Sequence, residues 1–231
     1  MSDVKVTEPE LDLPDDELIE PEAGGVGPAA ADDPKSSALS AVPQAIYWVE
    51  SAILLLGTAR RQTDTGLLIN PVARNALDIA RRHFHTDRRK IEISEADALL
   101  SVEKKFKEIR GFLSVCDSIF ISVDDQTAYD NTRGYFGSDV TVAAYTYARK
   151  SVSFTSQFPA LGPRCKTAIV IHQLAHYIDA RVSDTAGVRG YNYDRLDFES
   201  AIRNVHCYPN FAANATPPFQ DERWGLTRPD V

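Results

Sequence analysis

Residues 168–179 carry the pattern that decides the fold, and they read Ala-Ile-Val-Ile-His-Gln-Leu-Ala-His-Tyr-Ile-Asp. An apolar run leads into His172, and His176 follows four residues later with the small residue Ala175 before it. On an α-helix this spacing stacks both imidazoles on one face, with their nitrogens converging on a common point. The pattern predicts a metal-binding helix; the alternative is a buried helix whose histidines hydrogen-bond to backbone carbonyls.

Two flanking segments make the pattern more specific. Val152–Leu161 lies upstream, and Ala201–Ala212 downstream contains an N-x-x-x-Y-x-x-F-A pattern that starts at Asn204. Together with the H-x-x-x-H helix they resemble the aspzincins, the zinc metallopeptidases of the deuterolysin and peptidyl-Lys metalloendopeptidase type, over roughly residues 115–215. The resemblance implies an α+β, zincin-like metallopeptidase domain. In it, His172 and His176 would hold Zn²⁺, and zinc-activated water would hydrolyse a peptide bond.

The residue after the first histidine departs from the family pattern. Gln173 stands where the family has the glutamate that activates the zinc-bound water and passes its proton to the leaving amine. An amide cannot act as that base, and general acid–base assistance is worth about 10²–10⁴-fold. The resemblance therefore implies impaired hydrolysis, in a chain that is either naturally degenerate here or an engineered inactive form.

The third zinc ligand is a second departure. The family takes it from an aspartate in a G-T-x-D-x-x-Y-G-like loop after the helix, whereas this chain has Gly190 where the aspartate is expected. We favour Asp184, because a loop can fold back over the helix, and keep Asp194 and Asp179 as alternatives. Asp179 suits a hydrogen bond at the helix end better. Tyr193 is retained from the family pattern and would donate to the oxyanion of a tetrahedral intermediate, unless it is a packed loop residue.

Helical spacing of apolar residues predicts several helices in the amino-terminal half. The first begins at Pro43 and the second follows the pair Asn70-Pro71. The third begins at the capping residue Ser94, and we expect it to be the longest of this half.

The carboxy-terminal half is expected to hold a small sheet and two helices. β-Branched and aromatic residues between about 119 and 155 predict the sheet, with turns at 130–131 and 134–138. The active-site helix should run from about Cys165 to Ala180, and a last helix from about Phe198 to Ala213.

Charge and composition divide the chain into a tail and one domain. Residues 1–33 hold eleven Asp or Glu against the single Lys5, a net charge of −10 that leaves +2 for the remainder. Residues 1–40 are also rich in proline and glycine and contain no aromatic residue, so we expect a disordered acidic tail, either a solvated leader or a recruitment segment. One domain is expected over 41–215, followed by a carboxy-terminal extension over 216–231.

Several classes of partner are excluded by what the sequence lacks. A clustered Lys/Arg face, which nucleic-acid binding requires, is absent. Apolar runs such as Ala52–Leu56 are too short to span a bilayer, and the N-terminus has no export signal, so we expect no membrane partner. The sequence does not fix the localisation, and we expect a protein that is either cytoplasmic or exported by a specialised secretion system.

The remaining histidines and the cysteines are assigned structural roles. His83 and His85 end a basic helix and are expected to be solvated caps, and His206 is expected on a surface of the last helix, although it could face the site. The three cysteines are expected to be buried free thiols, with a Cys165–Cys207 disulfide as the alternative.

Three functions remain open on these grounds. The leading hypothesis is an impaired zinc metalloendopeptidase acting on a peptide or protein. A pseudopeptidase that binds such a partner without cleaving it is the second, and it could be a secreted bacterial effector. The third is a metal-free helical adaptor in which the two histidines are core residues.

Overall fold

The computed structural model describes residues 33–65, 71–136, 142–147, 149–184 and 193–216. Within these ranges the helices are α1 (Pro34–Thr65), α2 (Pro71–Phe84), α3 (Glu95–Leu113), α4 (Asp125–Phe136), α5 (Pro163–Ile178), α6 (Phe198–Ala201) and α7 (Cys207–Ala215). The strands are β1 (Phe120–Ser122), β2 (Ala144–Tyr147) and β3 (Ser151–Phe154). Three 3-10 helices complete the order: η1 (Cys116–Ser118), η2 (Phe158–Ala160) and η3 (Tyr193–Arg195). The predicted α+β class is confirmed.

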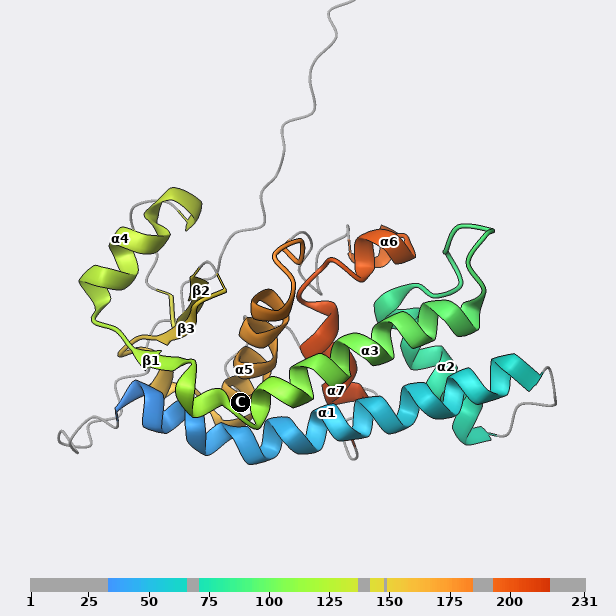
Figure 1. The fold of residues 1–231 in the computed structure, drawn as a ribbon, viewed down its shortest axis with the longest axis horizontal. Coiled ribbons are helices and arrows are strands. Elements are labelled where there is room, and N and C mark those ends of the chain that lie inside the picture. The colour runs from blue at the N-terminus through green and yellow to red at the C-terminus, as the bar shows by residue number, and fades with distance from the viewer. Residues whose placement is uncertain (1–32, 66–70, 137–141, 148, 185–192, 217–231) are drawn as a thin grey trace, which may run out of the picture.

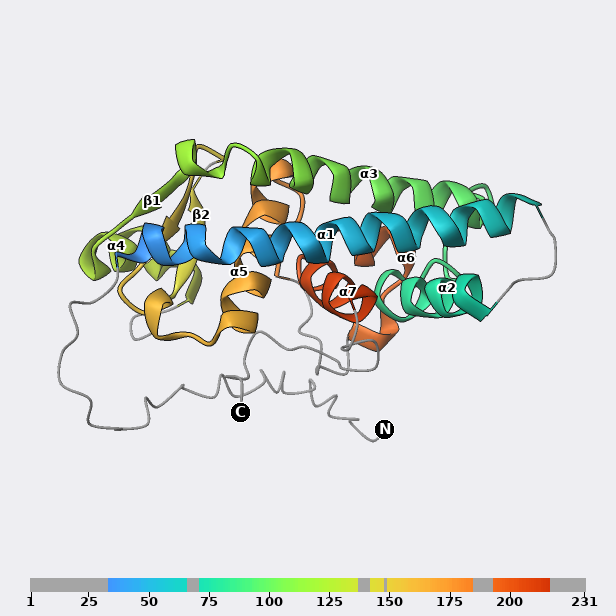
Figure 2. The ribbon, with the colours of Figure 1, turned by 90° about the horizontal axis from the view of Figure 1, so that it is seen from below.

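The helix α1 runs the length of the molecule, with α3 alongside it (Figures 1 and 2). It packs against α2, α3, α5 and α7. The small sheet and α4 lie at one end of α1, and α2 and α6 lie toward the other (Figure 1). The helix that carries the histidine pair, α5, therefore sits between the sheet and the helical end of the molecule.

The first helix begins earlier than its apolar spacing suggested. Pro34, not Pro43, is its first residue, and Asp33 caps it by accepting a hydrogen bond from the backbone N–H of Ser36 at 2.9 Å. An aspartate followed by proline is a favourable helix start, because the cap satisfies a free N–H and proline has none to satisfy. Residues 34–40, expected within the disordered tail, are therefore helical, while residues 1–32 lie outside the described ranges.

The length of α1 also bears on the expectation of no membrane partner. At 32 residues it is the longest helix described, rather than α3, and by length and composition alone it could cross a bilayer. The apolar run Ala52–Leu56 gave too small an estimate of the length of the helix, because the helix continues on both sides of this run. Ala45, Trp48 and Ala52 of α1 are completely buried against other helices, as in the core helix of a globular domain.

The other amino-terminal predictions hold in part. Ser94 accepts a hydrogen bond from the backbone N–H of Asp97 and caps α3, as predicted. The second helix, α2, begins at Pro71 as expected, and Asn70 lies outside the described residues. Between β1 and β2, however, residues 130–131 and 134–136, where turns were predicted, belong to α4, while residues 137–138 lie outside the described residues. The first turn of α4 is capped by the Asp124 carboxylate, which accepts from the N–H of Thr127 at 2.8 Å.

The sheet has the strand order β1-β3-β2. The central strand β3 pairs in parallel with β1, with Phe120 opposite Val152, and antiparallel with β2, with Ala144 opposite Phe154. In the described part of the sheet, β2 is an edge strand that packs against α5. This contact brings β2 beside the histidine pair.

The predicted last helix is divided into two. After α6 the chain leaves the helical path, and an isolated parallel bridge joins Asn204 to Ser183 before α7 begins at Cys207. The bridge consists of two hydrogen bonds, from Ser183 N to Arg203 O at 2.9 Å and from Val205 N to Ser183 O at 3.0 Å. These bonds replace the intrahelical bonds that a continuous helix would make.

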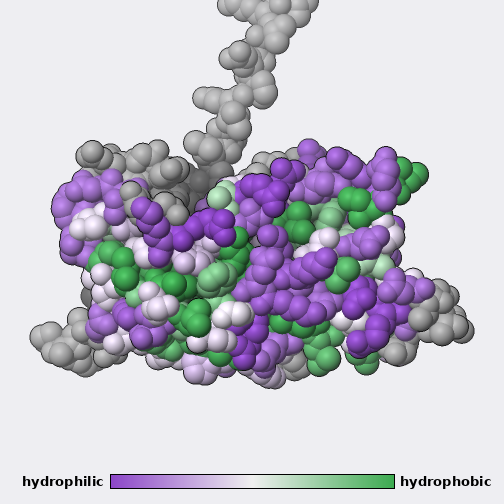
Figure 3. Space-filling model, viewed as in Figure 1, coloured by the Kyte–Doolittle hydropathy of each residue, from purple (hydrophilic) through white to green (hydrophobic). Residues whose placement is uncertain are grey.

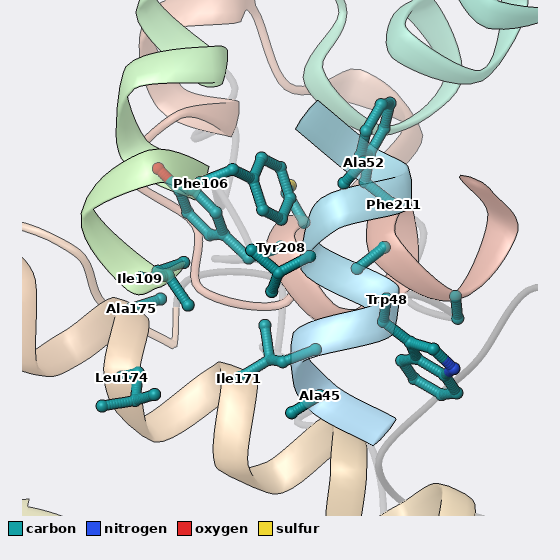
Figure 4. Packing of buried hydrophobic residues seen from close by; sticks show 14 of the residues in the cluster. Ala45, Trp48, Ala52, Phe106, Ile109, Ile171, Leu174, Ala175, Tyr208 and Phe211 are labelled. Atoms are coloured by element: carbon teal, nitrogen blue, oxygen red, sulfur yellow. The ribbon is translucent and has the colours of Figure 1, made fainter. Parts of the chain in front are cut away.

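One apolar core joins α1, α3, α5 and α7. Figure 4 shows its labelled side chains meeting between these helices, with Phe106 of α3 beside Tyr208 and Phe211 of α7. The cysteines are free and buried, which excludes the Cys165–Cys207 disulfide. On the face seen in Figure 3 hydrophilic residues predominate, and hydrophobic ones gather near β1 and the end of α3.

Candidate metal centre

The helix α5 presents His172 and His176 on one face, as the spacing predicted. Pro163 opens this helix after Gly162, so the helix begins and ends two residues earlier than the predicted span of about Cys165 to Ala180. At the other end, Arg149 donates from Nε to the carbonyl of Tyr177 at 2.7 Å and from its guanidinium to that of Ile178 at 2.9 Å. These bonds satisfy carbonyls that the helix leaves free and place a cation at its negative end.

The carboxylate of Asp184 lies between the two imidazoles. Its Oδ1 is 3.2 Å from Nε2 of His172, and its Oδ2 is 3.2 Å from Nε2 of His176. Of the three aspartates considered as a third ligand, Asp184 is the one that the structure brings to the histidine pair.

A third imidazole reaches the same carboxylate. Nε2 of His206, at the start of α7, lies 3.3 Å from Oδ1 of Asp184. The ligand atoms of His172, Asp184 and His206 all lie within 4.8 Å of one another, a cluster that could hold a metal ion. The expectation of a surface position for His206 is therefore wrong. Its 34-residue separation from His172 gave no spacing signal, because the Ser183–Asn204 bridge, a tertiary contact, brings them together.

Hydrogen bonding fixes the orientation of His176. Its Nδ1 lies 3.1 Å from the carbonyl oxygen of Val182, which can only accept, so this nitrogen carries a proton. Its Nε2 faces a second acceptor, the carboxylate of Asp184. With Nδ1 held by the backbone carbonyl of Val182, Nε2 is the atom of His176 that would bind a cation beside Asp184, and the carbonyl would be the outer partner of the ring.

Burial sets the charge state of the cluster. Burial lowers the pKa of His172 despite the neighbouring Asp184, and burial together with the nearby imidazole of His172 lowers the pKa of His206 to about 4. Burial alone would raise the pKa of the Asp184 carboxyl, but its contacts with His172 and His176 outweigh this and hold that pKa well below its usual range. At neutral pH, therefore, His172 and His206 are neutral and Asp184 is ionised, the states in which they bind metals.

The distances from the Asp184 carboxylate to the three imidazoles are close to the distance between two ligands of a small tetrahedral ion. Donors about 2.0–2.2 Å from a tetrahedral zinc lie roughly 3.3–3.6 Å apart, close to the three separations of 3.2, 3.2 and 3.3 Å measured here. The side chain of Asp184 is 42% exposed, whereas His172 is buried and His206 is 19% exposed. An ion would therefore enter from the side of Asp184.

The amide of Gln173 is bound to the sheet. The hydroxyl of Thr146 lies 2.9 Å from both Oε1 and the backbone carbonyl oxygen of Gln173, and Nε2 of Gln173 donates to the carbonyl of Ala144 at 3.2 Å. The side chain is buried, and both partners belong to β2. One neighbouring donor and one neighbouring acceptor match an amide, whereas a carboxylate would face the Ala144 carbonyl without a proton to share.

Tyr193 lies in a separate buried network. Its hydroxyl is 2.8 Å from Nδ1 of His83, and its carbonyl is 2.9 Å from Nε2 of His85. His83 and His85 are buried, so the expectation that they are solvated caps is wrong. The structure does not bring Tyr193 into the group of candidate metal ligands, and its role at an oxyanion remains a prediction.

The other two aspartates lie apart from the centre. Asp179 follows the last residue of α5 and pairs with Lys105 and Arg181, each at 2.9 Å. It therefore lies at the helix end, as expected, and is not a metal ligand in this arrangement. Asp194 belongs to η3, where its backbone carbonyl accepts from Arg88. Gly190 lies outside the described residues.

Comparison with known proteins gave no match of any kind. No family model, curated protein or solved structure resembles the chain closely enough to identify a relative.

Proposed function

We propose that this chain is a zinc-binding protein with a zincin-like domain of the aspzincin type, in which peptide-bond hydrolysis is impaired. His172, His176 and Asp184 hold the ion. The observation that carries the proposal is that the Asp184 carboxylate lies 3.2 Å from Nε2 of both His172 and His176, while Nδ1 of His176 is hydrogen-bonded to the carbonyl of Val182.

The protein's own groups support binding better than bond cleavage. Zinc at such a site supplies a Lewis acid and lowers the pKa of a bound water. A peptidase then needs a nearby base to take the proton and pass it on, and Gln173 has no basic atom. Its amide is also held by Thr146 and Ala144, so it is a link between α5 and β2.

A second function, the capture of a peptide or protein without cleavage, is favoured by the same hydrogen bonds. Through these bonds the amide of Gln173 links α5 to β2, and a glutamate, which has no N–H, could not donate to the Ala144 carbonyl. The hydrogen bonds of Gln173 to β2 suit an amide at this position. They therefore support a pseudopeptidase, in which residue 173 is not a base, over an enzyme that has merely lost its glutamate.

Metal content tests the centre directly. Protein purified without chelators is expected to contain about one zinc per chain, and His172→Ala is expected to contain almost none. Plasma mass spectrometry measures the metal, and circular dichroism checks that the variant is folded. Absence of metal from the folded wild-type protein, even after zinc is added, would contradict the proposal and favour the metal-free adaptor.

Replacing Gln173 by a charged residue tests whether its hydrogen bonds to β2 require an amide. Gln173→Glu is expected to lower the free energy of unfolding at pH 7 by about 1–3 kcal/mol, because a buried carboxylate would face the Ala144 carbonyl. Protonation restores a donor, so the pKa of the new carboxyl is raised in the folded protein; the deficit should shrink below about pH 4 and grow as pH rises above it. Urea denaturation at several pH values measures both effects.

The uncharged variant Gln173→Met serves as the control. It loses the same hydrogen bonds, but its stability relative to wild type should not change across this pH range. If Gln173→Glu is as stable as wild type at pH 7 and hydrolyses peptides, the chain is a peptidase that lacks only its base, and the non-cleaving function is wrong.

A further inference from the structure

His206 is held toward the centre by the backbone as well as by its own side chain. Asn204, two residues earlier, pairs with Ser183, and Asp184 directly follows Ser183. One bridge thus places the carboxylate and the third imidazole together. On the other side, the carbonyl of His206 accepts from the side chain of Asn210 at 2.6 Å.

The helix behind His206 leaves this imidazole little freedom to move away. All nine residues of α7 are buried, and Tyr208 and Phe211 pack against Phe84 and Phe106. The centroid of the His206 ring is 5.2 Å from that of His172, about the same as the 5.0 Å between the rings of His172 and His176. The ring of His206 is thus about as close to that of His172 as the ring of His176 is, and the ligand atoms of His206, His172 and Asp184 lie within 4.8 Å of one another.

From this arrangement we propose that His206 is a fourth protein ligand, which closes the metal centre. The proposal rests on the zinc centre proposed above. Four protein ligands complete a tetrahedral ion, as in structural zinc sites, whereas catalytic sites keep one position for water. The imidazole of His206 takes that position, so the chain lacks both a base at Gln173 and a place for the nucleophile.

Cobalt substitution separates a closed centre from an open one. Chelator-treated protein is loaded with Co²⁺, and the visible absorption is recorded before and after addition of acetohydroxamate, a small anionic ligand for open metal positions. Wild type is expected to give the strong absorption of four-coordinate Co²⁺ and no change with the hydroxamate. His206→Ala is expected to give a spectrum that shifts with the hydroxamate, and free imidazole should restore the wild-type form.

Zinc affinity gives a readout that does not depend on spectra. His206→Ala is expected to weaken binding by more than the roughly 10–100-fold that loss of an outer hydrogen-bond partner costs. His206→Gln, which retains a polar side chain, provides a second variant if the alanine protein does not fold. The matched control is His85→Asn, which removes a buried imidazole elsewhere at a backbone φ of 47° that asparagine tolerates; its affinity should equal that of wild type.

The outcomes distinguish the two proposals. If His172→Ala loses the metal while both His206 variants bind it as tightly as wild type, or if wild-type Co²⁺ protein responds to the hydroxamate, the centre is open and the fourth-ligand proposal is wrong. If folded His172→Ala retains full affinity, the zinc centre itself is wrong. Loss in both His172 and His206 variants, with His85→Asn unchanged, supports the closed centre.

Discussion

Zinc added to the metal-free protein is expected to raise its free energy of unfolding by about 4 kcal/mol when free zinc is roughly a thousand times its dissociation constant. The reason is that the ligands come from α5, the segment after it and the start of α7, and only the folded chain brings them together. Thermal or urea denaturation with and without zinc measures the difference. In Asp184→Ala the rise should almost disappear at the same zinc concentration.

Asp179→Ala is the matched control for this experiment. It removes a carboxylate near the end of the same helix, and the loss of its pairs with Lys105 and Arg181 should lower stability with or without metal. The increment due to zinc should nevertheless remain at its wild-type value. An equal rise in Asp184→Ala would show that zinc binds without this carboxylate and would contradict the centre.

Phe211→Ala is expected to lower the free energy of unfolding by about 3–5 kcal/mol. Phe211 is fully buried, and its ring centroid lies 5.5 Å from those of both Phe84 and Phe106. Truncation removes buried apolar surface and leaves a cavity between α2, α3 and α7. Urea denaturation of protein kept in chelator measures this cost without the contribution of metal.

A surface position provides the comparison for the core variant. Leu54 lies on α1 and is 70% exposed. Leu54→Ala should therefore change the free energy of unfolding by less than about 0.5 kcal/mol. A loss of similar size in both variants would mean that α1 buries the face around Leu54 against something else. A loss below about 1 kcal/mol in Phe211→Ala would contradict the described packing of α7.

Local patterns in the sequence were sufficient for the helix of the histidine pair and for the cap at Ser94. Both depend on residues within four positions of one another, which helical geometry brings together whatever the rest of the chain does. The start of α1 and the existence of α4 were also encoded locally, by aspartate caps at Asp33 and Asp124. They were missed because the proline and glycine content of residues 1–40 was interpreted as disorder, and residues 130–131 and 134–138 were interpreted as turns.

The centre itself was only partly predictable. Asp184 could be proposed because it lies eight residues beyond His176, within reach of a loop that folds back. His206 could not, since its approach depends on the pairing of Ser183 with Asn204. The hydrogen bonds of Gln173 to β2 likewise join residues far apart in sequence, so the missing glutamate was visible but the use of the amide was not.

The bridge between Ser183 and Asn204 also has a kinetic consequence. Two backbone hydrogen bonds are a short connection, of the kind that opens by local fluctuation well before the whole protein unfolds. Each opening lets Asp184 move away from His206, which α7 holds in place, and so removes the carboxylate from the group of ligands. In the proposed centre, the residence time of the ion is therefore governed by how often this small contact breaks, and slow amide exchange at Ser183 and Val205 would accompany slow metal release.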